Sequence, residues 1–223
     1  MSFIVAIDGP AGTGKGTITK LISKEMGLVN IDTGATYRCV ALYCIENNIN
    51  VADTEKIIDN LPNINIDMKN ENGEQTVYLN GEDVTSKIRT PEVTKIVSEV
   101  SSIKEVRFAM VDVQRNLALG KDVIMEGRDI TTYVFPNADV KIYMDADEVE
   151  RANRRYKEMQ EKGMEITFEE VLENIQKRDK NDKEKEIGAL KIAEDAIYVD
   201  TTKLTIEEVK EKIKGIIEEK RGK

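Results

Sequence analysis

The residues with the clearest capacity for chemistry lie at positions 4–17, in the sequence IVAIDGPAGTGKGT. The apolar run at 4–7 is typical of a buried parallel strand, and a helical pattern begins after the glycine loop that follows it. The backbone N–H groups of residues 12–16 can cradle phosphate oxygens, helped by the positive end of the helix. Lys15 can reach the β- and γ-phosphates, and the Thr17 hydroxyl can face Mg²⁺, directly or through water. The predicted ATP-binding residues are Gly9, Pro10, Ala11, Gly12, Thr13, Gly14, Lys15, Gly16 and Thr17.

The spacing Gly9-x4-Gly14-Lys15 is that of a phosphate-binding loop, but Gly16 stands where a serine or threonine usually follows the lysine. This GKGT ending resembles the nucleoside-monophosphate kinases more than the GTPases or motor ATPases. The alternative is a glycine turn that carries a lysine by chance, which residue frequencies predict in roughly one chain in a hundred. The strand and helix patterns on either side favour phosphate binding.

Composition sets the class of protein. With 223 residues, of which 40% are hydrophobic, the chain can bury a full core, and we expect one domain with insertions. We see no membrane-spanning or signal pattern, and Cys39 and Cys44 are expected to be free thiols, which together predict a cytoplasmic protein. The absence of histidine excludes a histidine base or metal ligand. The net charge of −9 argues against nucleic-acid binding, so local cations must hold any anionic substrate.

The elements that position this loop alternate between strands and helices. Five short apolar runs predict a mostly parallel five-stranded sheet with helices on both faces, an α/β fold. These runs lie at 4–7, 28–31, 122–125, 140–144 and 196–199. Two alternating segments at 64–68 and 76–80, with Asn72-Gly73 between them, predict an antiparallel hairpin in an inserted subdomain at about 62–87.

Longer helical patterns follow the hairpin. Thr90-Pro91 predicts the start of a helical region that runs to about Leu119. Asp147 with Glu150 and Thr167 with Glu170 resemble capping boxes, which predict helices through Lys162 and to about Asp182. The first of these carries Arg151, Arg154 and Arg155 at i, i+3 and i+4. They can neutralise a moving phosphoryl group, or instead form a solvated face paired with Glu158.

Several motifs together resemble the bacterial cytidylate kinase family over essentially the whole chain. Besides the GPAGTGKGT loop, they are residues 32–38 (DTGATYR), 88–90 (IRT), 126–130 (EGRDI), 134–136 (VFP) and 160–163 (QEKG). The resemblance implies a five-stranded core, a hairpin-bearing monophosphate-binding insertion and a helical lid at about 150–186. It also implies transfer of the γ-phosphoryl group of ATP to CMP or dCMP, with Mg²⁺, giving ADP and CDP or dCDP.

The resemblance assigns roles to individual residues. It makes Lys15, Arg154 and Arg155 the catalytic cations, and no general base is needed because the acceptor oxygen is already anionic. A carboxylate that accepts from the cytosine N4 amine, beside an arginine that donates to N3 or O2, would distinguish cytosine from uracil. The implied CMP-binding residues are Thr33, Arg38, Ser98, Arg107, Arg128, Asp129, Arg178, Asp182 and Lys185.

Each of these roles has a plainer alternative. Arg38 can lie along the surface, and Ser98 and Arg107 can be ordinary helix-surface residues. Asp129 can belong to a structural ion pair, and Arg178 to a solvated helix face. The sequence also departs from the family pattern at three positions. Lysine replaces the usual arginine at 185 and loses its bidentate fork, Thr131 stands where glycine is common, and Thr33 replaces a common serine.

Two other functions compete with this interpretation. One is a kinase for another monophosphate, UMP or AMP, against which the Asp129 carboxylate argues. The other is a nucleotide-dependent binding switch, which would need a guanine-reading Asn-Lys-x-Asp stretch that the sequence lacks. The expected partners are ATP and CMP or dCMP, without nucleic acid or membrane, and we expect a monomer.

Overall fold

The structure is a computed structural model that describes residues 2–71, 74–161 and 163–222. Within them, a five-stranded parallel sheet has the strand order β2-β6-β1-β7-β8. Its strands are β1 (Ile4–Asp8), β2 (Val29–Asp32), β6 (Val123–Gly127), β7 (Val140–Asp145) and β8 (Ile197–Asp200). The predicted α/β class is confirmed, with strand ends shifted by one or two residues from the apolar runs.

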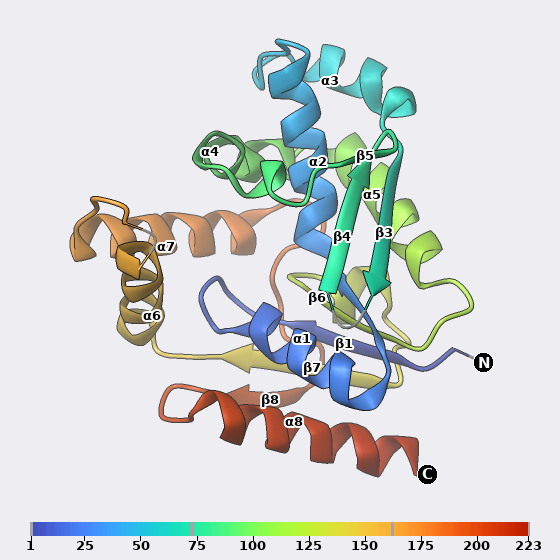
Figure 1. Ribbon diagram of the computed structural model, residues 1–223, viewed down its shortest axis with the longest axis vertical. Coiled ribbons are helices and arrows are strands. Elements are labelled where there is room, and N and C mark those ends of the chain that lie inside the picture. The colour runs from blue at the N-terminus through green and yellow to red at the C-terminus, as the bar shows by residue number, and fades with distance from the viewer. Residues whose placement is uncertain (1, 72–73, 162, 223) are drawn as a thin grey trace.

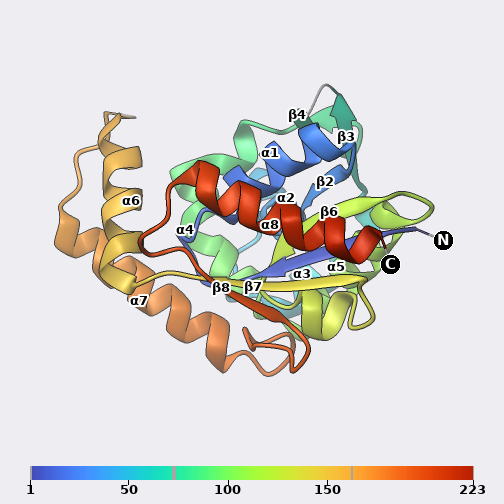
Figure 2. The same ribbon diagram turned by 90° about the horizontal axis from the view of Figure 1, so that it is seen from below.

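Helices cover both faces of this sheet, as Figures 1 and 2 show. Alternate residues of β1 point to opposite sides, so Val5 and Ile7 enter one core and Ala6 enters the other. The first core is shared with α1 (Lys15–Met26) and α8 (Ile206–Arg221). The second is shared with α2 (Thr33–Glu46) and α5 (Lys104–Ala118). Burial on both faces explains why the strands are continuous apolar runs.

The inserted segment forms a three-stranded antiparallel sheet of β3 (Ile66–Glu71), β4 (Glu74–Leu79) and β5 (Glu82–Asp83). It follows α3 (Thr54–Asn60), and the predicted Asn72-Gly73 turn lies outside the described residues. Met68 and Val77 face each other across β3 and β4, and both are buried in the core that contains α2 and α5. The insertion is therefore packed against the second core.

The predicted helical region from Pro91 to Leu119 is in fact two helices, α4 (Pro91–Val100) and α5. At the break, the hydroxyls of Ser101 and Ser102 both donate to the Ser98 carbonyl, at 3.0 and 2.9 Å. Such side-chain bonds compete with the backbone bonds of a helix. The break also leaves the Ser101 carbonyl free to accept from Arg107 at 3.1 Å, which matters for the site below.

Two further helices, α6 (Glu148–Glu161) and α7 (Phe168–Glu184), project from the body of the molecule (Figure 1). They pack on each other through a small separate core around Ala152, Val171 and Ile175. The Thr167–Glu170 capping box is present in full. The Asp147–Glu150 box is incomplete: Asp147 accepts from the Glu150 N–H at 3.2 Å, but the Glu150 carboxylate pairs with Arg154 instead. We call α6 and α7 the lid helices.

Candidate active site

The glycine loop joins β1 to α1 at the carboxyl edge of the sheet. α1 begins at Lys15 after Gly14, with no side-chain cap and no acidic residue in its first turn. An uncapped helix start of this kind offers backbone N–H groups to an anion. The Lys15 ammonium folds over the loop and donates to the carbonyls of Gly9 and Pro10, both at 2.7 Å. The structure thus holds Lys15 within the loop it is predicted to serve.

Two carboxylates that the sequence analysis did not single out lie next to the glycine loop, at the same edge of the sheet. Asp32 and Glu126 lie opposite each other in register at the ends of β2 and β6. An ideal Cβ at Gly16 would come within 2.7 Å of a Glu126 oxygen, which explains why a glycine follows Lys15 here. Burial and the charge of Asp32 raise the pKa of Glu126, and burial lowers the pKa of Lys15. The signal in the sequence was that both carboxylates end buried strands that meet at one sheet edge.

A group of four arginines lies across from the loop, and we call Arg38, Arg128, Arg155 and Arg178 the arginine cluster. They come from α2, the segment after β6, α6 and α7. Burial, followed by the charges of Arg128, Arg38 and Arg155, lowers the pKa of Arg178 to about 10. Burial and the neighbouring arginines also lower the pKa of Arg38. Like charges held this close in a half-buried site favour an anion between them.

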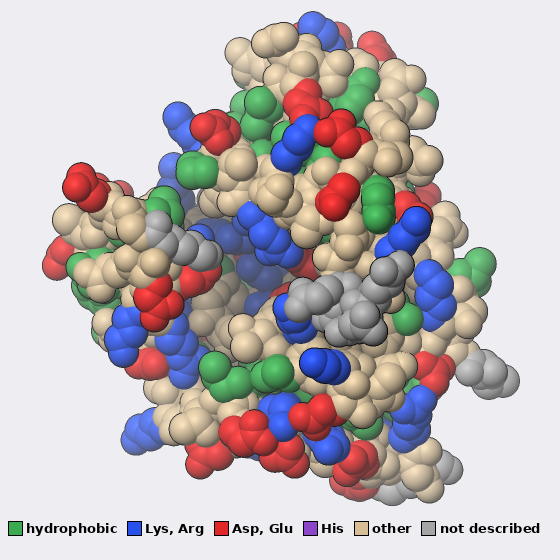
Figure 3. Space-filling model, in the orientation of Figure 1, with side chains coloured by type: hydrophobic (Ala, Val, Ile, Leu, Met, Phe, Trp, Pro, Cys, Tyr) green, Lys and Arg blue, Asp and Glu red, His purple; other side chains and the backbone are tan. Residues whose placement is uncertain are grey.

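The contacts within the cluster leave it only partly neutralised. Arg38 donates to the Ile88 carbonyl and to the Thr94 hydroxyl, both at 3.0 Å and both uncharged. Arg128 pairs with Asp182 at 2.8 Å. Arg155 pairs with Glu158 at 2.7 Å on the lid surface, as the plainer alternative predicted. Figure 3 shows Lys and Arg side chains gathered in a hollow between the lid helices and the body.

The other two arginines of α6, Arg151 and Arg154, contact different parts of the molecule. Arg151 is buried, pairs with Asp179 at 2.6 Å and donates to the Ala11 carbonyl of the glycine loop at 2.9 Å. Arg154 donates to the Thr201 carbonyl at 2.7 Å, beside the end of β8. In this conformation Arg154 is therefore engaged away from the arginine cluster, and Arg151 ties the lid helices to the loop.

Asp129 and Arg107 form a buried ion pair beside the cluster. Arg107 also lies 5.3 Å from the centroid of the Tyr37 ring, and its Nε has no hydrogen-bond partner among the described residues. Burial raises the pKa of Asp129, and Arg107 opposes that shift. The structure brings these two predicted base-binding residues together. The hydroxyl of the third, Ser98, accepts from Asn181 of α7 at 3.5 Å.

The end of α7 closes this side of the site. Asp182 accepts from Arg128 and also from Lys185 at 2.9 Å. Although burial opposes it, Arg128 and Lys185 lower the pKa of Asp182 below its usual range. Lys185 also donates to the Ser101 hydroxyl at 3.2 Å, so its charge bridges the lid and α4. Thr33 lies deeper and donates to the Glu126 carbonyl at 2.7 Å, away from solvent.

Gly188, in the segment after α7, packs directly against the Arg107–Asp129 pair. It has a φ of +66°, and an ideal Cβ there would lie 2.1 Å from Arg107 Nη2 and 2.2 Å from an Asp129 oxygen. A side chain at this position would displace the pair. No motif pointed to Gly188, because its importance comes from a contact between segments distant in sequence.

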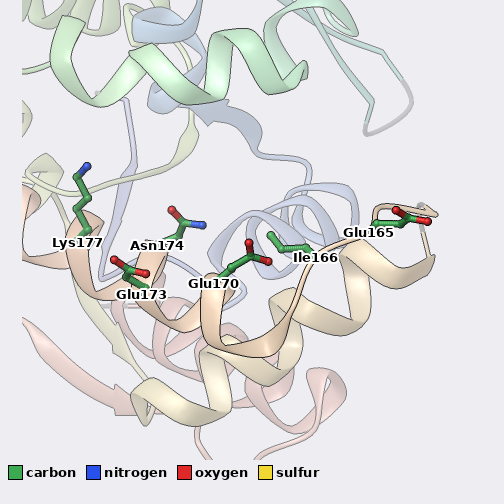
Figure 4. Close-up of a pocket in the computed structure, with 6 residues that line it drawn as sticks. All are labelled: Glu165, Ile166, Glu170, Glu173, Asn174 and Lys177. Atoms are coloured by element: carbon green, nitrogen blue, oxygen red, sulfur yellow. The ribbon is translucent and has the colours of Figure 1, made fainter.

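A second hollow lies on the lid helices (Figure 4). It is lined by Glu165, Ile166, Glu170, Glu173, Asn174 and Lys177. None of these is a predicted site residue, and the three carboxylates would repel a nucleotide phosphate. The charge of the arginine cluster suits a nucleotide phosphate better than this hollow does.

Comparison with known proteins agrees with this geometry. A family model described as cytidylate kinase matches residues 5–219. The chain belongs to the cytidylate kinase family. It is 51% identical over 209 residues to the cytidylate kinase of Caldicellulosiruptor saccharolyticus, covering 94% of this chain and 92% of that protein. It is also 51% identical over 208 residues to that of Fusobacterium nucleatum, covering 93% and 94%.

Among solved structures, an uncharacterized protein from Eubacterium ventriosum shares the fold. Its TM-score is 0.52 at 11% sequence identity, with 98% of this chain and 99% of that chain covered. At this identity the likeness concerns the fold alone. In the part of the chain that the structure describes, no helix is long and apolar enough to cross a membrane. Cys39 and Cys44 are free and buried.

Proposed function

We propose that this member of the cytidylate kinase family transfers the γ-phosphoryl group of ATP to CMP or dCMP, giving ADP and CDP or dCDP. The observation that carries the proposal is the arginine cluster opposite the glycine loop, in a protein whose net charge is −9. Half-buried arginines with so few acidic partners favour two anionic substrates held side by side. The family's name and its relatives agree with that reading.

The reaction depends on aligning the two nucleotides and neutralising the charge of the transferred phosphoryl group, more than on proton transfer. The loop N–H groups and Lys15 hold the donor phosphates, while Arg38 and Arg128 hold the acceptor phosphate. Closing of the lid helices would bring Arg154 and Arg155 toward the moving phosphoryl group. For Arg154 this means exchanging its bond to the Thr201 carbonyl for one to phosphate. Water has to be excluded at the same time, because it competes as the acceptor.

Base selection rests on the Arg107–Asp129 pair. Asp129 would accept from the cytosine N4 amine, and the unpartnered Nε of Arg107 is a donor available for N3 or O2. Uracil would place an oxygen against the carboxylate. Asp182 and Arg178 are proposed to contact the ribose, with Ser98 at the base and Lys185 near the acceptor phosphate.

Residues that fit Mg²⁺ are present at the loop. No group of three or more acidic, cysteine or histidine side chains among the described residues is arranged to hold a metal ion by itself. Mg²⁺ bound with ATP usually takes most of its ligands from phosphates and water, so one hydroxyl and nearby carboxylates suffice. Thr17, with Asp32 and Glu126 acting through water, would hold it. Mg²⁺ supplies neutralisation of the phosphate charge.

The chain is proposed to be a monomer in the cytoplasm, with the insertion at about 62–87 and the lid at about 150–186 as its moving parts. A coupled assay with ATP against CMP, dCMP, UMP and AMP tests the function. We expect kcat/KM to be greatest for CMP or dCMP. Faster turnover of AMP than of CMP would contradict the base assignment, and turnover of no acceptor would contradict the kinase itself.

A further inference from the structure

Asp8, the last residue of β1, carries a carboxylate with no solvent exposure. It accepts hydrogen bonds from the Ile130 N–H at 2.9 Å, the Thr131 N–H at 2.7 Å and the Thr131 hydroxyl at 2.6 Å. Asp8 immediately precedes the glycine loop, and its partners immediately follow Arg128 and Asp129. The carboxylate therefore joins the donor-binding loop directly to the acceptor-binding segment.

The segment that Asp8 holds is a single wide turn, from Ile130 to Val134. The N–H groups of Tyr133 and Val134 both bond to the Asp129 carbonyl, at 2.8 and 3.1 Å. The backbone of Asp129 is thus tied to the turn, and the turn is tied to Asp8. The direction of the Asp129 carboxylate toward Arg107 depends on both ties.

The Thr131 hydroxyl gives the Asp8 carboxylate a third hydrogen-bond donor, in addition to the two backbone N–H groups. A residue without a hydroxyl would leave Asp8 with the two N–H donors only, and Thr131 is 1% exposed, so water does not substitute. A buried carboxylate is stable as an anion only when donors surround it. The hydroxyl that departs from the family pattern is therefore part of the support of the site.

We propose that Asp8 and Thr131 are positioning residues, which form a latch that holds Arg128 and Asp129 in place relative to the glycine loop for acceptor binding. The proposal rests on the proposed kinase function. In this proposal, neither Asp8 nor Thr131 contacts the substrate. The latch acts through Asp129, so it governs the binding of CMP more than the binding of ATP.

The groups that face Asp8 predict a pH signature for the latch. The pKa of Asp8 is raised to about 6. Burial is the main cause and the charge of Asp129 adds to it, while the hydrogen bonds from Thr131 and Ile130 oppose the rise. Lys15 and Tyr143 also interact electrostatically with Asp8. When Asp8 takes up a proton, its protonated oxygen no longer accepts. Without the Thr131 hydroxyl the proton is held more tightly, so the latch opens at higher pH.

The test compares Thr131→Val, which keeps the shape and removes the hydroxyl, with Thr131→Ser, which keeps the hydroxyl. KM for CMP and KM for ATP are measured separately from about pH 5.5 to about pH 8. We expect Thr131→Val to raise KM for CMP about fivefold or more while KM for ATP changes less than about twofold. We also expect the acid rise in KM for CMP to move to higher pH, and Thr131→Ser to retain the parent values.

Thr131→Gly is the second variant, for the case in which valine disturbs folding. It keeps the backbone donor and should also raise KM for CMP. Three results would each overturn the latch. The first is an equal change in KM for CMP and KM for ATP, and the second is no change in either value for Thr131→Val and Thr131→Gly. The third is a Thr131→Ser variant as impaired as the Thr131→Val variant. If the parent protein phosphorylates no monophosphate, the proposed function fails instead, so the two failures are distinguishable.

Discussion

At the scale of single residues, charge is distributed very unevenly. The protein carries a net charge of −9, yet Arg38, Arg128, Arg155 and Arg178 converge on one hollow. Among the residues that the structure describes, Arg128 alone of these four pairs with a buried carboxylate, that of Asp182. Burying such cations without a partner is unfavourable, and bound phosphates would relieve it. The destabilisation is what makes the site receptive to anions.

Lys15 should be essential for the rate of transfer. Lys15→Met is expected to lower kcat at least about 100-fold, because a charge directed at the moving phosphoryl group is lost. Lys24→Met, on the exposed last turn of the same helix, is the matched control and should retain activity. Steady-state kinetics with ATP and CMP make the comparison. A Lys15→Met enzyme within a few-fold of the parent would show that the loop lysine has no role in transfer.

Asp129 should decide between cytosine and uracil. Removing the side chain leaves Arg107 buried with neither a counter-charge nor a hydrogen-bond acceptor and destabilises the fold by about 3–5 kcal/mol. Asp129→Asn also loses the charge but keeps an amide oxygen that can accept from Arg107, so it is the better variant. The amide keeps the shape but gains a donor that opposes the N4 amine. We expect the ratio of kcat/KM for CMP over UMP to fall about tenfold or more. Equal losses for CMP and UMP would contradict the assigned role.

At the scale of elements, polar contacts made by charged side chains join the lid helices to the body. Arg151 binds the glycine loop, Asp182 binds Arg128, and Lys185 reaches Ser101. The apolar core of the lid is its own, separate from the two cores of the sheet. Any motion of the lid helices relative to the body would therefore exchange polar contacts and leave packed apolar surface intact.

The sequence predicted the elements well where a pattern is local. The glycine loop, the five strands and the Thr167 capping box depend on neighbouring residues, and all are present in the structure. It failed where the outcome depends on distant contacts. Helical spacing puts Arg151 and Arg154 on one side of the helix, but it does not reveal that Arg151 pairs with Asp179 and that Arg154 donates to the Thr201 carbonyl. The break before α5 has a local cause, the bonds from Ser101 and Ser102 to the Ser98 carbonyl, which apolar periodicity does not reveal.

Gly188 tests the contact between the segment after α7 and the base-binding pair. Gly188 and Gly163 have similar φ values, +66° and +71°, but only Gly188 has atoms within 4 Å of its ideal Cβ. Alanine at either position carries the same strain of the left-handed conformation, about 1–2 kcal/mol. We expect Gly188→Ala to raise KM for CMP at least about fivefold, with Gly163→Ala close to the parent. Similar values for the two variants would mean that strain alone explains the effect.

At the scale of the whole molecule, the active site is a source of instability that depends on pH. Burial raises the pKa of Asp8 to about 6 and raises that of Glu126 as well. The folded state therefore holds these protons at pH values where the unfolded chain has lost them. The free energy of unfolding must fall as the pH rises from about 4 toward 7. Asp182, whose pKa is lowered, works in the opposite direction, but only below about pH 4.

Urea unfolding of the nucleotide-free protein measures this dependence. From Asp8 alone, the free energy of unfolding should fall by about 2 kcal/mol between pH 4.5 and pH 7. Asp8→Asn, which cannot titrate, should show a flatter profile. A parent protein whose stability rises through this range would show that the buried carboxylates are not protonated as we infer.

The account as a whole rests on two nucleotides meeting between the glycine loop and the arginine cluster. A crystal structure of the protein with CMP, Mg²⁺ and a non-hydrolysable ATP analogue tests this most directly. We predict the CMP phosphate between Arg38 and Arg128, cytosine against Asp129 and Arg107, and the triphosphate around Lys15. CMP bound away from these side chains, or a triphosphate that leaves the glycine loop empty, would contradict the account.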